Sequence, residues 1–142
     1  MPEIEIRPPR LESSPRHAVV VFNNVEIANS RRAILIHETG HPACWYIPPE
    51  DVRVEYLQRV PSSTHCPWKG DAHYYNIEID GEISESAAWC YAEPKPDFFQ
   101  IKHYIAFYPA RVDSCTVDGV KVKPEAVKYY GGWVIDTDEP IG

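Results

Sequence analysis

The sequence predicts a mainly β fold built from antiparallel strands, with one short helix. Short runs of β-branched and aromatic residues alternate with turn residues, and the 142 residues include fourteen prolines, nine tyrosines and four tryptophans. Three residue pairs that favour tight hairpin turns separate such runs: Asn23-Asn24, Asp80-Gly81 and Asp118-Gly119. A parallel α/β sheet would need a helix between successive strands, and the sequence has a helical pattern in one segment alone.

The strands predicted in the N-terminal half are bounded by asparagine, glycine and proline. Residues 1–15 are rich in proline and charge, and they predict an arm or an edge strand. Strands are predicted next at residues 18–22, 25–28, 33–36, 43–47 and 52–56. The last of these alternates strictly between apolar and polar residues, which indicates a half-buried strand. Residues 61–71 contain two prolines, two serines, a threonine and a glycine, so they predict a loop.

The clearest hairpin joins residues 73–79 to residues 82–91. Side chains alternate between the two faces of a strand. One face of the first strand should therefore carry Tyr75, Ile77 and Ile79, and the other Tyr74, Asn76 and Glu78. On the returning strand, we expect Ala87, Trp89 and Tyr91 to share a face.

One helix is predicted over residues 97–108. Asp97 can cap its N-terminus and Gln100 completes a capping box. Apolar residues recur at helical spacing up to Pro109, which ends the run. A last hairpin pairs residues 112–117 with 120–122, and residues 131–139 are expected to form a tail.

Composition limits the class of protein. A chain of 142 residues and 16.3 kDa has the size of one domain that needs no metal or disulfide to fold. The apolar runs are too short to span a bilayer and the N-terminus lacks a signal-peptide pattern, so we expect a cytoplasmic protein without a membrane partner. The net charge of −7 argues against nucleic-acid binding. A homodimer is left open.

The cysteines give no pattern of a metal site. Cys44, Cys66, Cys90 and Cys115 occur singly, whereas structural zinc sites draw their ligands from close pairs. Disulfides are not expected in a reducing cytosol. We therefore expect no metal and no cofactor.

The segment from Thr64 to Gly70 brings three reactive groups together in the sequence. His65, Cys66 and Lys69 supply an imidazole, a thiol and an ammonium. Neighbouring cations could lower the pKa of the thiol and make Cys66 a nucleophile or a redox centre. The alternatives are a rigid loop with Cys66 packed inward, and a loop whose Lys69 contacts a ligand.

Aromatic residues on the predicted strands suggest a pocket. Tyr46, Tyr74, Trp89 and Tyr91 could wall a cleft between sheets, or they could simply be core residues. Glu38 and Glu85 are candidates for buried carboxylates, which would need a partner such as Lys69 or an arginine.

Several motifs together resemble the family catalogued as domain of unknown function 427, also labelled nucleotidyltransferase-like. The matching segments are residues 25–30, 38–42, 46–48, 64–75, 87–91 and 105–113. The match runs through residues 16–123, which we therefore expect to form one domain, with residues 1–15 as an arm and 124–142 as an extension. The sequence has neither a phosphate-cradling loop nor a paired-aspartate metal site to support a transferase activity.

The resemblance also implies a fold and a site. The family is similar to the β-tent group, in which two antiparallel sheets lean together around a cleft; the zinc-binding cysteine pairs common in that group are missing here. The implied cleft residues are Glu38, Tyr46, Cys66, Lys69, Tyr74, Trp89 and Tyr91. We expect a domain that binds a small polar or aromatic molecule there. The alternatives are a thiol-dependent enzyme using Cys66 and a structural or interaction module without a ligand.

Overall fold

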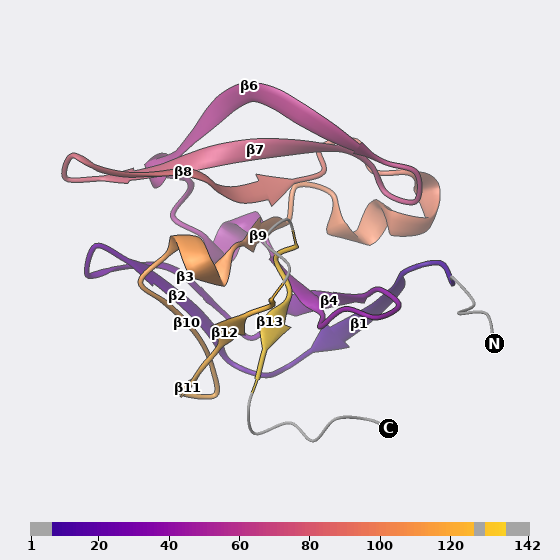
Figure 1. The fold of residues 1–142 in the computed structure, drawn as a ribbon, viewed down its shortest axis with the longest axis horizontal. Helices are drawn as coiled ribbons and strands as arrows, with labels where there is room; N and C mark the ends of the chain where they lie inside the picture. The colour runs from indigo at the N-terminus through magenta and orange to yellow at the C-terminus, as the bar shows by residue number, and fades with distance from the viewer. Residues whose placement is uncertain (1–6, 127–129, 136–142) are drawn as a thin grey trace.

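Two antiparallel sheets dominate the computed structural model, which describes residues 7–126 and 130–135 (Figure 1). The larger sheet has seven strands in the order β1-β4-β5-β9-β8-β7-β6. Their bounds are Arg10–Ser14 for β1, Ala33–His37 for β4, Cys44–Ile47 for β5, Ile105–Phe107 for β9, Glu82–Cys90 for β8, Gly70–Ile79 for β7 and Leu57–Cys66 for β6. In Figure 1 the strands β6, β7 and β8 form an upper layer, while β1 and β4 lie below.

The smaller sheet has four strands in the order β11-β10-β2-β3. The strands are Val120–Lys121 for β11, Ser114–Val117 for β10, Ala18–Phe22 for β2 and Val25–Ser30 for β3. A two-stranded sheet pairs β12 (Lys123–Pro124) with β13 (Trp133–Val134). Short 3-10 helices complete the described residues: η1 (Pro49–Asp51), η2 (Val54–Tyr56), η3 (Pro96–Ile101) and η4 (Pro109–Arg111). The predicted fold class is confirmed.

The three predicted hairpin turns are present and have the backbone that their residues favour. Asn23 and Asn24 have φ angles of 49° and 63°, and Asp80 and Gly81 have 50° and 84°. Positive φ at both turn positions matches the twist of the flanking strands, and asparagine, aspartate and glycine adopt it at low cost. These local signals are why the strand pairs were predictable.

The predicted strand at residues 52–56 and the predicted helix at residues 97–108 differ from the structure. Residues 52–56 are not a strand, because Val52 makes a single bridge to Ala28 and η2 follows. The helix predicted over 97–108 is limited to η3, and β9 occupies residues 105–107. Phe98 and Ile101 are buried side chains of η3, whereas the buried Ile105 belongs to strand β9. The apolar residues at helical spacing therefore belong to two different elements.

The predicted loop at residues 61–71 is mostly strand β6, and the turn proper covers residues 67–69. β6 lies at the edge of the large sheet, where a proline such as Pro61 is tolerated because it interrupts few ladder hydrogen bonds. The pairing of β6 with β7 slips between Arg59 and Ser63. Most β6 side chains are exposed, so the strand has the polar composition of a loop.

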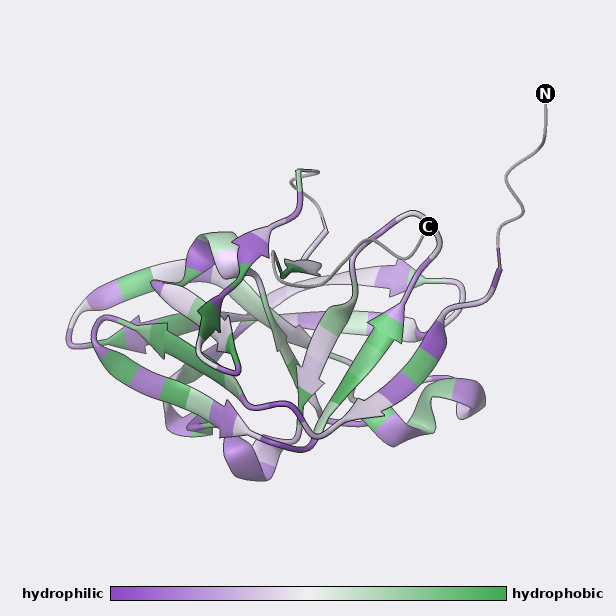
Figure 2. Ribbon diagram, turned by 90° about the horizontal axis from the view of Figure 1, so that it is seen from below, coloured by the Kyte–Doolittle hydropathy of each residue, from purple (hydrophilic) through white to green (hydrophobic). Residues whose placement is uncertain are grey.

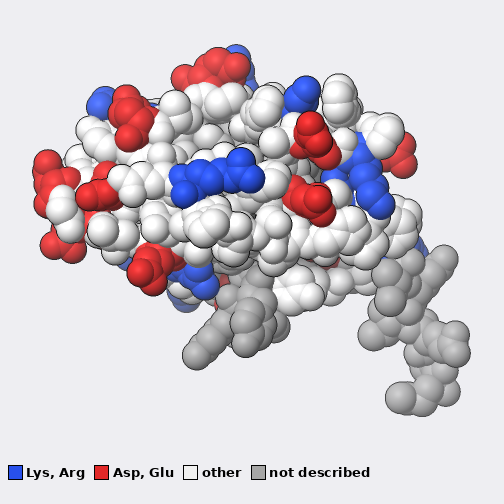
Figure 3. Space-filling view, turned by 90° about the horizontal axis from the view of Figure 1, so that it is seen from above, with Lys and Arg blue, Asp and Glu red and all other residues white. Residues whose placement is uncertain are grey.

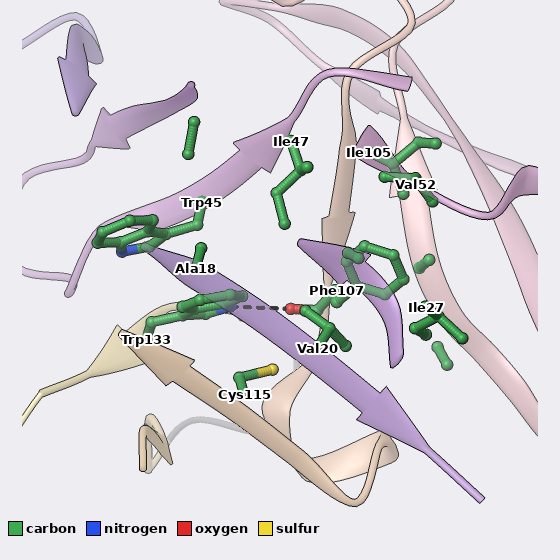
Figure 4. Close-up of a cluster of buried hydrophobic side chains, with 14 of the residues drawn as sticks. Ala18, Val20, Ile27, Trp45, Ile47, Val52, Ile105, Phe107, Cys115 and Trp133 are labelled. Atoms are coloured by element: carbon green, nitrogen blue, oxygen red, sulfur yellow. Dashed lines mark hydrogen bonds between the residues drawn. The ribbon is translucent and has the colours of Figure 1, made fainter. Parts of the chain in front are cut away.

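The first core cluster fills the space between the two sheets (Figure 4). Ile47 and Phe107 of the large sheet meet Val20 and Cys115 of the small sheet. Figure 2 shows the alternation of hydrophobic and hydrophilic residues along the strands that supply such side chains.

Trp133 belongs to this cluster, so the prediction of a tail is wrong at that position. Its ring stacks on Trp45 with centroids 5.3 Å apart, and its Nε1 donates a hydrogen bond to the carbonyl oxygen of Phe107 at 3.1 Å. Asp136 to Glu139, the acidic part of the expected tail, lies outside the described residues.

The second cluster lies on the opposite face of the large sheet and includes Ile36, Tyr46, Trp89 and Tyr91. The alternation predicted for β7 holds, because Ile77 and Ile79 join the first cluster and Tyr74 packs on the second. On β8, Ala87 was expected on the same face as Trp89 and Tyr91, but it packs in the first cluster on the opposite face. The reason is an irregularity around Ser86, which has a φ of 47°.

Candidate functional site

A hollow of about 390 Å³ opens beside the second cluster and is lined by six of the seven predicted site residues. These six are Glu38, Tyr46, Cys66, Lys69, Tyr74 and Trp89. The seventh, Tyr91, lies behind the wall, with its ring centroid 5.7 Å from Nζ of Lys69. The volume falls within the range of small-molecule sites.

The hollow does not lie between the two sheets, where the cleft was expected. The first cluster occupies that space, because the large residues Trp45 and Phe107 project into it. Tyr46 and Trp89 project from the other face of the large sheet, which the small sheet leaves uncovered.

Lys69 is the buried cation of the site. It sits in the β6–β7 turn, is 5% exposed, and its Nζ donates a hydrogen bond to Oε1 of Glu38 at 2.5 Å. Removing an ammonium from water is unfavourable unless it is paired, so the Glu38 carboxylate offsets this cost. The Tyr91 ring adds a cation–π contact.

The turn that carries Lys69 is held from the side by residues 93–95. The backbone N–H of Lys95 donates to the carbonyl oxygen of Lys69 at 2.8 Å, and Nζ of Lys95 donates to that of Pro67 at 2.7 Å. Gly70 has a φ of 113°, and a Cβ there would lie 3.3 Å from the carbonyl oxygen of Glu93. Glycine is therefore required where the chain leaves the turn.

Aromatic rings form the opposite wall. Nε1 of Trp89 donates to the hydroxyl of Tyr46 at 3.1 Å, and the two rings meet edge to face. The hydroxyl of Tyr74 lies 2.8 Å from Oγ1 of Thr64, and the ring of Tyr108 lies 4.5 Å from that of Trp89. Burial raises the pKa of Tyr46 well above its ordinary value, so its phenol stays protonated at neutral pH.

The sequence analysis missed several residues of the wall. Those not predicted as ligand contacts are His41, Cys44, His65, Pro67, Trp68, Tyr108, Tyr130 and Gly131. His65, Pro67 and Trp68 were identified only as part of the motif around Cys66. The others reach the hollow through contacts between distant segments.

Residues 130–133, which we call the strap, form one side of the hollow. A Cβ at Gly131 would lie 2.3 Å from the ring of Trp89, so the backbone passes directly against the indole. The N–H of Trp133 donates to the carbonyl oxygen of Ala43 at 2.9 Å. In the sequence, the Gly-Gly-Trp motif at residues 131–133 was the feature that could have drawn attention to this segment, but it does not indicate where the strap packs.

His41 and Glu125 hold the strap at its start. Nδ1 of His41 lies 2.9 Å from Oε2 of Glu125, and Oε1 of Glu125 accepts a hydrogen bond from the N–H of Gly132 at 2.9 Å. The His41 ring stacks on Tyr130 with centroids 4.0 Å apart. The site is therefore assembled from segments as far apart in the sequence as His41 and Glu125.

Two thiols reach the hollow. Burial raises the pKa of Cys44 to about 12, against the opposing effect of the Lys69 ammonium, so Cys44 remains a thiol at neutral pH. Cys66 lies on the same wall as His65 and Lys69. All four cysteines are free.

A second hollow of about 370 Å³ adjoins the first and shares Tyr108 and Tyr130 with it. The Arg111 guanidinium lies 4.6 Å from the centroid of the Tyr108 ring. These two tyrosines therefore separate a polar compartment around Lys69 from one beside Arg111 and Pro124.

Residues 7–126 and 130–135 contain neither a cluster of metal ligands nor a membrane-spanning helix. No three His, Cys, Asp or Glu side chains gather there as a metal site requires. No helix within these residues is long and apolar enough to cross a bilayer. Figure 3 shows positive and negative side chains interspersed on the face above β6.

The comparison with known families places most of the chain in one family. A family model described as domain of unknown function (DUF427) matches residues 10–118. The chain belongs to this family, and the resemblance drawn from the sequence is confirmed. The short name of the family model refers to nucleotidyltransferases, which agrees with the second label of the family given above. No curated protein matches the chain. Tyr130 and Gly131 lie beyond the matched residues.

Proposed function

We propose that this domain binds a small polar or aromatic molecule in the hollow between Lys69 and Trp89. The observation that carries the proposal is a buried ammonium, paired with Glu38, on the wall of a hollow that is also lined by the rings of Tyr74, Trp89 and Tyr108. Rings exclude water and stack on flat ligands, while a few converging polar groups orient them. The four free cysteines fit a reducing location such as the cytoplasm.

The ion pair supports a binding role better than a purely structural one. A buried pair adds little net stability, and apolar residues of similar volume often replace such a pair without loss. Lys69 and Glu38 come from separate turns, and both line the same hollow. Their position therefore suits recognition of a ligand's polar group.

A thermal-shift screen of small metabolites tests the proposal. We expect at least one flat polar compound to raise the melting temperature of the native protein and to lose this effect in Lys69→Met. Lys102→Met is the matched control, because Lys102 is exposed and contacts Phe99 away from the hollow. If no compound stabilises the protein, or if Lys69→Met responds as the native protein does, the proposal fails. A blank screen with a stable dimer in light scattering would favour an interaction module.

Thiol chemistry at Cys66 is the second candidate, because Cys66 lines the same hollow as Lys69 and His65. A catalytic or redox thiol should react with iodoacetamide markedly faster than free cysteine at neutral pH. Labelling of Cys66 no faster than that of the buried Cys90 and Cys115 would exclude this role.

A further inference from the structure

We infer that the ligand's polar group is electrically neutral and presents a hydrogen-bond acceptor beside a donor, as a carboxamide, lactam or ureide does. This inference rests on the proposed function and narrows its ligand class. It excludes phosphates and carboxylates as the recognised group, although a buried lysine alone would favour an anion.

The basic side chains on the wall of the hollow are already paired. Within the described residues, every basic side chain that lines the hollow already lies beside a carboxylate. The pairs are Lys69 with Glu38, His41 with Glu125 and His65 with Asp71. An anionic ligand would have to displace Glu38 from Lys69 or lie against its carboxylate. Both are unfavourable beside Lys69, because this ammonium is itself buried and depends on its counter-charge.

The Lys69–Glu38 pair retains the capacity for further hydrogen bonds. In the described part of the chain, the structure gives Nζ of Lys69 one hydrogen bond, to Oε1 of Glu38. A lysine ammonium has three N–H bonds, and a carboxylate accepts at both oxygens. Lys69 can therefore still donate to a ligand carbonyl, while Glu38 can still accept from an adjacent ligand N–H.

The remaining wall includes aromatic rings whose polar atoms are already bonded. The indole of Trp89 and the phenol ring of Tyr74 line the hollow. The indole N–H of Trp89 already donates a hydrogen bond to the hydroxyl of Tyr46, and the Tyr74 hydroxyl is hydrogen-bonded to that of Thr64. The half-buried Tyr74 therefore offers mainly its ring, whereas Trp89 is 6% exposed and offers only the part of its indole that Gly131 and Tyr108 leave uncovered. An apolar surface of this kind suits a flat ring attached to the polar group.

Benzamide and benzoate are matched probes, because they differ only in replacing the amide NH₂ by a negatively charged oxygen. Both are titrated into ¹⁵N-labelled full-length protein, and the indole N–H signal of Trp89 reports binding at the site. We expect benzamide to bind at least about tenfold more tightly than benzoate, the effect of one hydrogen bond to a charged group.

In Glu38→Gln the order of the two affinities should reverse, so that benzoate binds more tightly than benzamide. Lys69 then lacks its counter-charge, and the carboxylate of benzoate can supply it. Glu82→Gln, at an exposed glutamate outside the hollow, should leave the order unchanged. If Glu38→Gln does not fold, the comparison in the native protein decides alone. Benzoate binding as tightly as benzamide, or an unchanged order in Glu38→Gln, overturns the inference.

The result also separates this inference from the proposed function. If neither probe shifts the Trp89 signal while other compounds of the screen do, the neutral-amide class is wrong and the binding function stands. If no compound of any class shifts it, both fail.

Discussion

Lys69 and Glu38 form an ion pair whose lysine is buried and whose glutamate is partly open to solvent. Lys69→Met leaves the Glu38 carboxylate without its cation, and Glu38→Gln leaves a buried ammonium without its counter-charge. We expect each to lower the free energy of unfolding by about 1–3 kcal/mol. The double variant should lose less than the sum of the two, because removing both charges leaves neither one stranded.

Urea unfolding followed by tryptophan fluorescence measures this double-mutant cycle. Lys102→Met again serves as the control for loss of a lysine charge, and its free energy of unfolding should change by less than about 0.5 kcal/mol. Additive losses in the double variant would show that the two side chains do not stabilise each other.

Cys44 should be the less reactive of the two thiols at the hollow. Its pKa of about 12 leaves almost no thiolate at pH 7.5, so we expect alkylation by iodoacetamide at least about tenfold slower than for free cysteine. Timed labelling with mass spectrometry checks this. The same cysteine in urea-unfolded protein is the control and should react at the ordinary rate; equal rates in both states would refute the burial argument.

At the scale of elements, the backbone of the strap passes directly against the Trp89 ring. In Gly131→Ala the new Cβ meets the Trp89 ring at 2.3 Å, so the indole or the strap must move. We expect a loss of about 1–3 kcal/mol in the free energy of unfolding, and a displaced Trp89 indole signal in NMR.

Gly119→Ala is a control that distinguishes the effect of the Gly131→Ala clash from the effect of backbone strain alone. Gly119 has a φ of 81° and nothing within 4 Å of its ideal Cβ, so alanine there adds strain without a contact. It should lower stability and leave the Trp89 signal in place. If Gly131→Ala also leaves that signal unmoved, the strap does not form the wall described.

The elements that could be predicted from sequence are those with local causes. Asn23-Asn24 and Asp80-Gly81 have residues suited to positive φ, and the strands beside them have dense β-branched or alternating patterns. β6 was mistaken for a loop because an exposed edge strand needs no apolar face. The helix was drawn too long because Phe98, Ile101 and Ile105 share a spacing across two elements.

The residues of the candidate site likewise divide into those that could be predicted from the sequence and those that could not. Trp89 and Tyr74 could be placed on one wall because alternation along paired strands is regular. Glu38 and Lys69 were candidates from the sequence itself, as a buried carboxylate and a possible partner, and the resemblance placed both in a cleft. His41 could not be predicted, since its partner Glu125 lies 84 residues further along the chain. Only tertiary packing brings such residues together, and a single sequence contains no direct signal of it.

For the molecule as a whole, burial of thiols and phenols predicts sensitivity to alkali. Burial raises the pKa of Cys44, Cys115, Tyr46 and Tyr91 in the folded chain. The ordinary thiol value is 9.0, so the unfolded chain releases protons at a pH where the folded chain still holds them. The contribution to stability is therefore complete below pH 9.0 and declines as the pH rises toward 12.

Free energies of unfolding from urea titrations between pH 7 and pH 10.5 measure this decline. Cys115→Ala should flatten the curve above the ordinary thiol pKa of 9.0, since it removes one buried thiol of the first cluster. A stability that stays constant over the whole range would contradict the burial of these groups.

The two faces of the large sheet are used differently. One face is packed by the first cluster against the small sheet, while the other carries the hollow. A crystal structure of the protein with the strongest compound from the thermal-shift screen tests this division most directly. We predict density for the compound between the Trp89 ring and the Lys69–Glu38 pair. Density in the neighbouring hollow beside Arg111, with the Lys69 side unoccupied, would contradict the account.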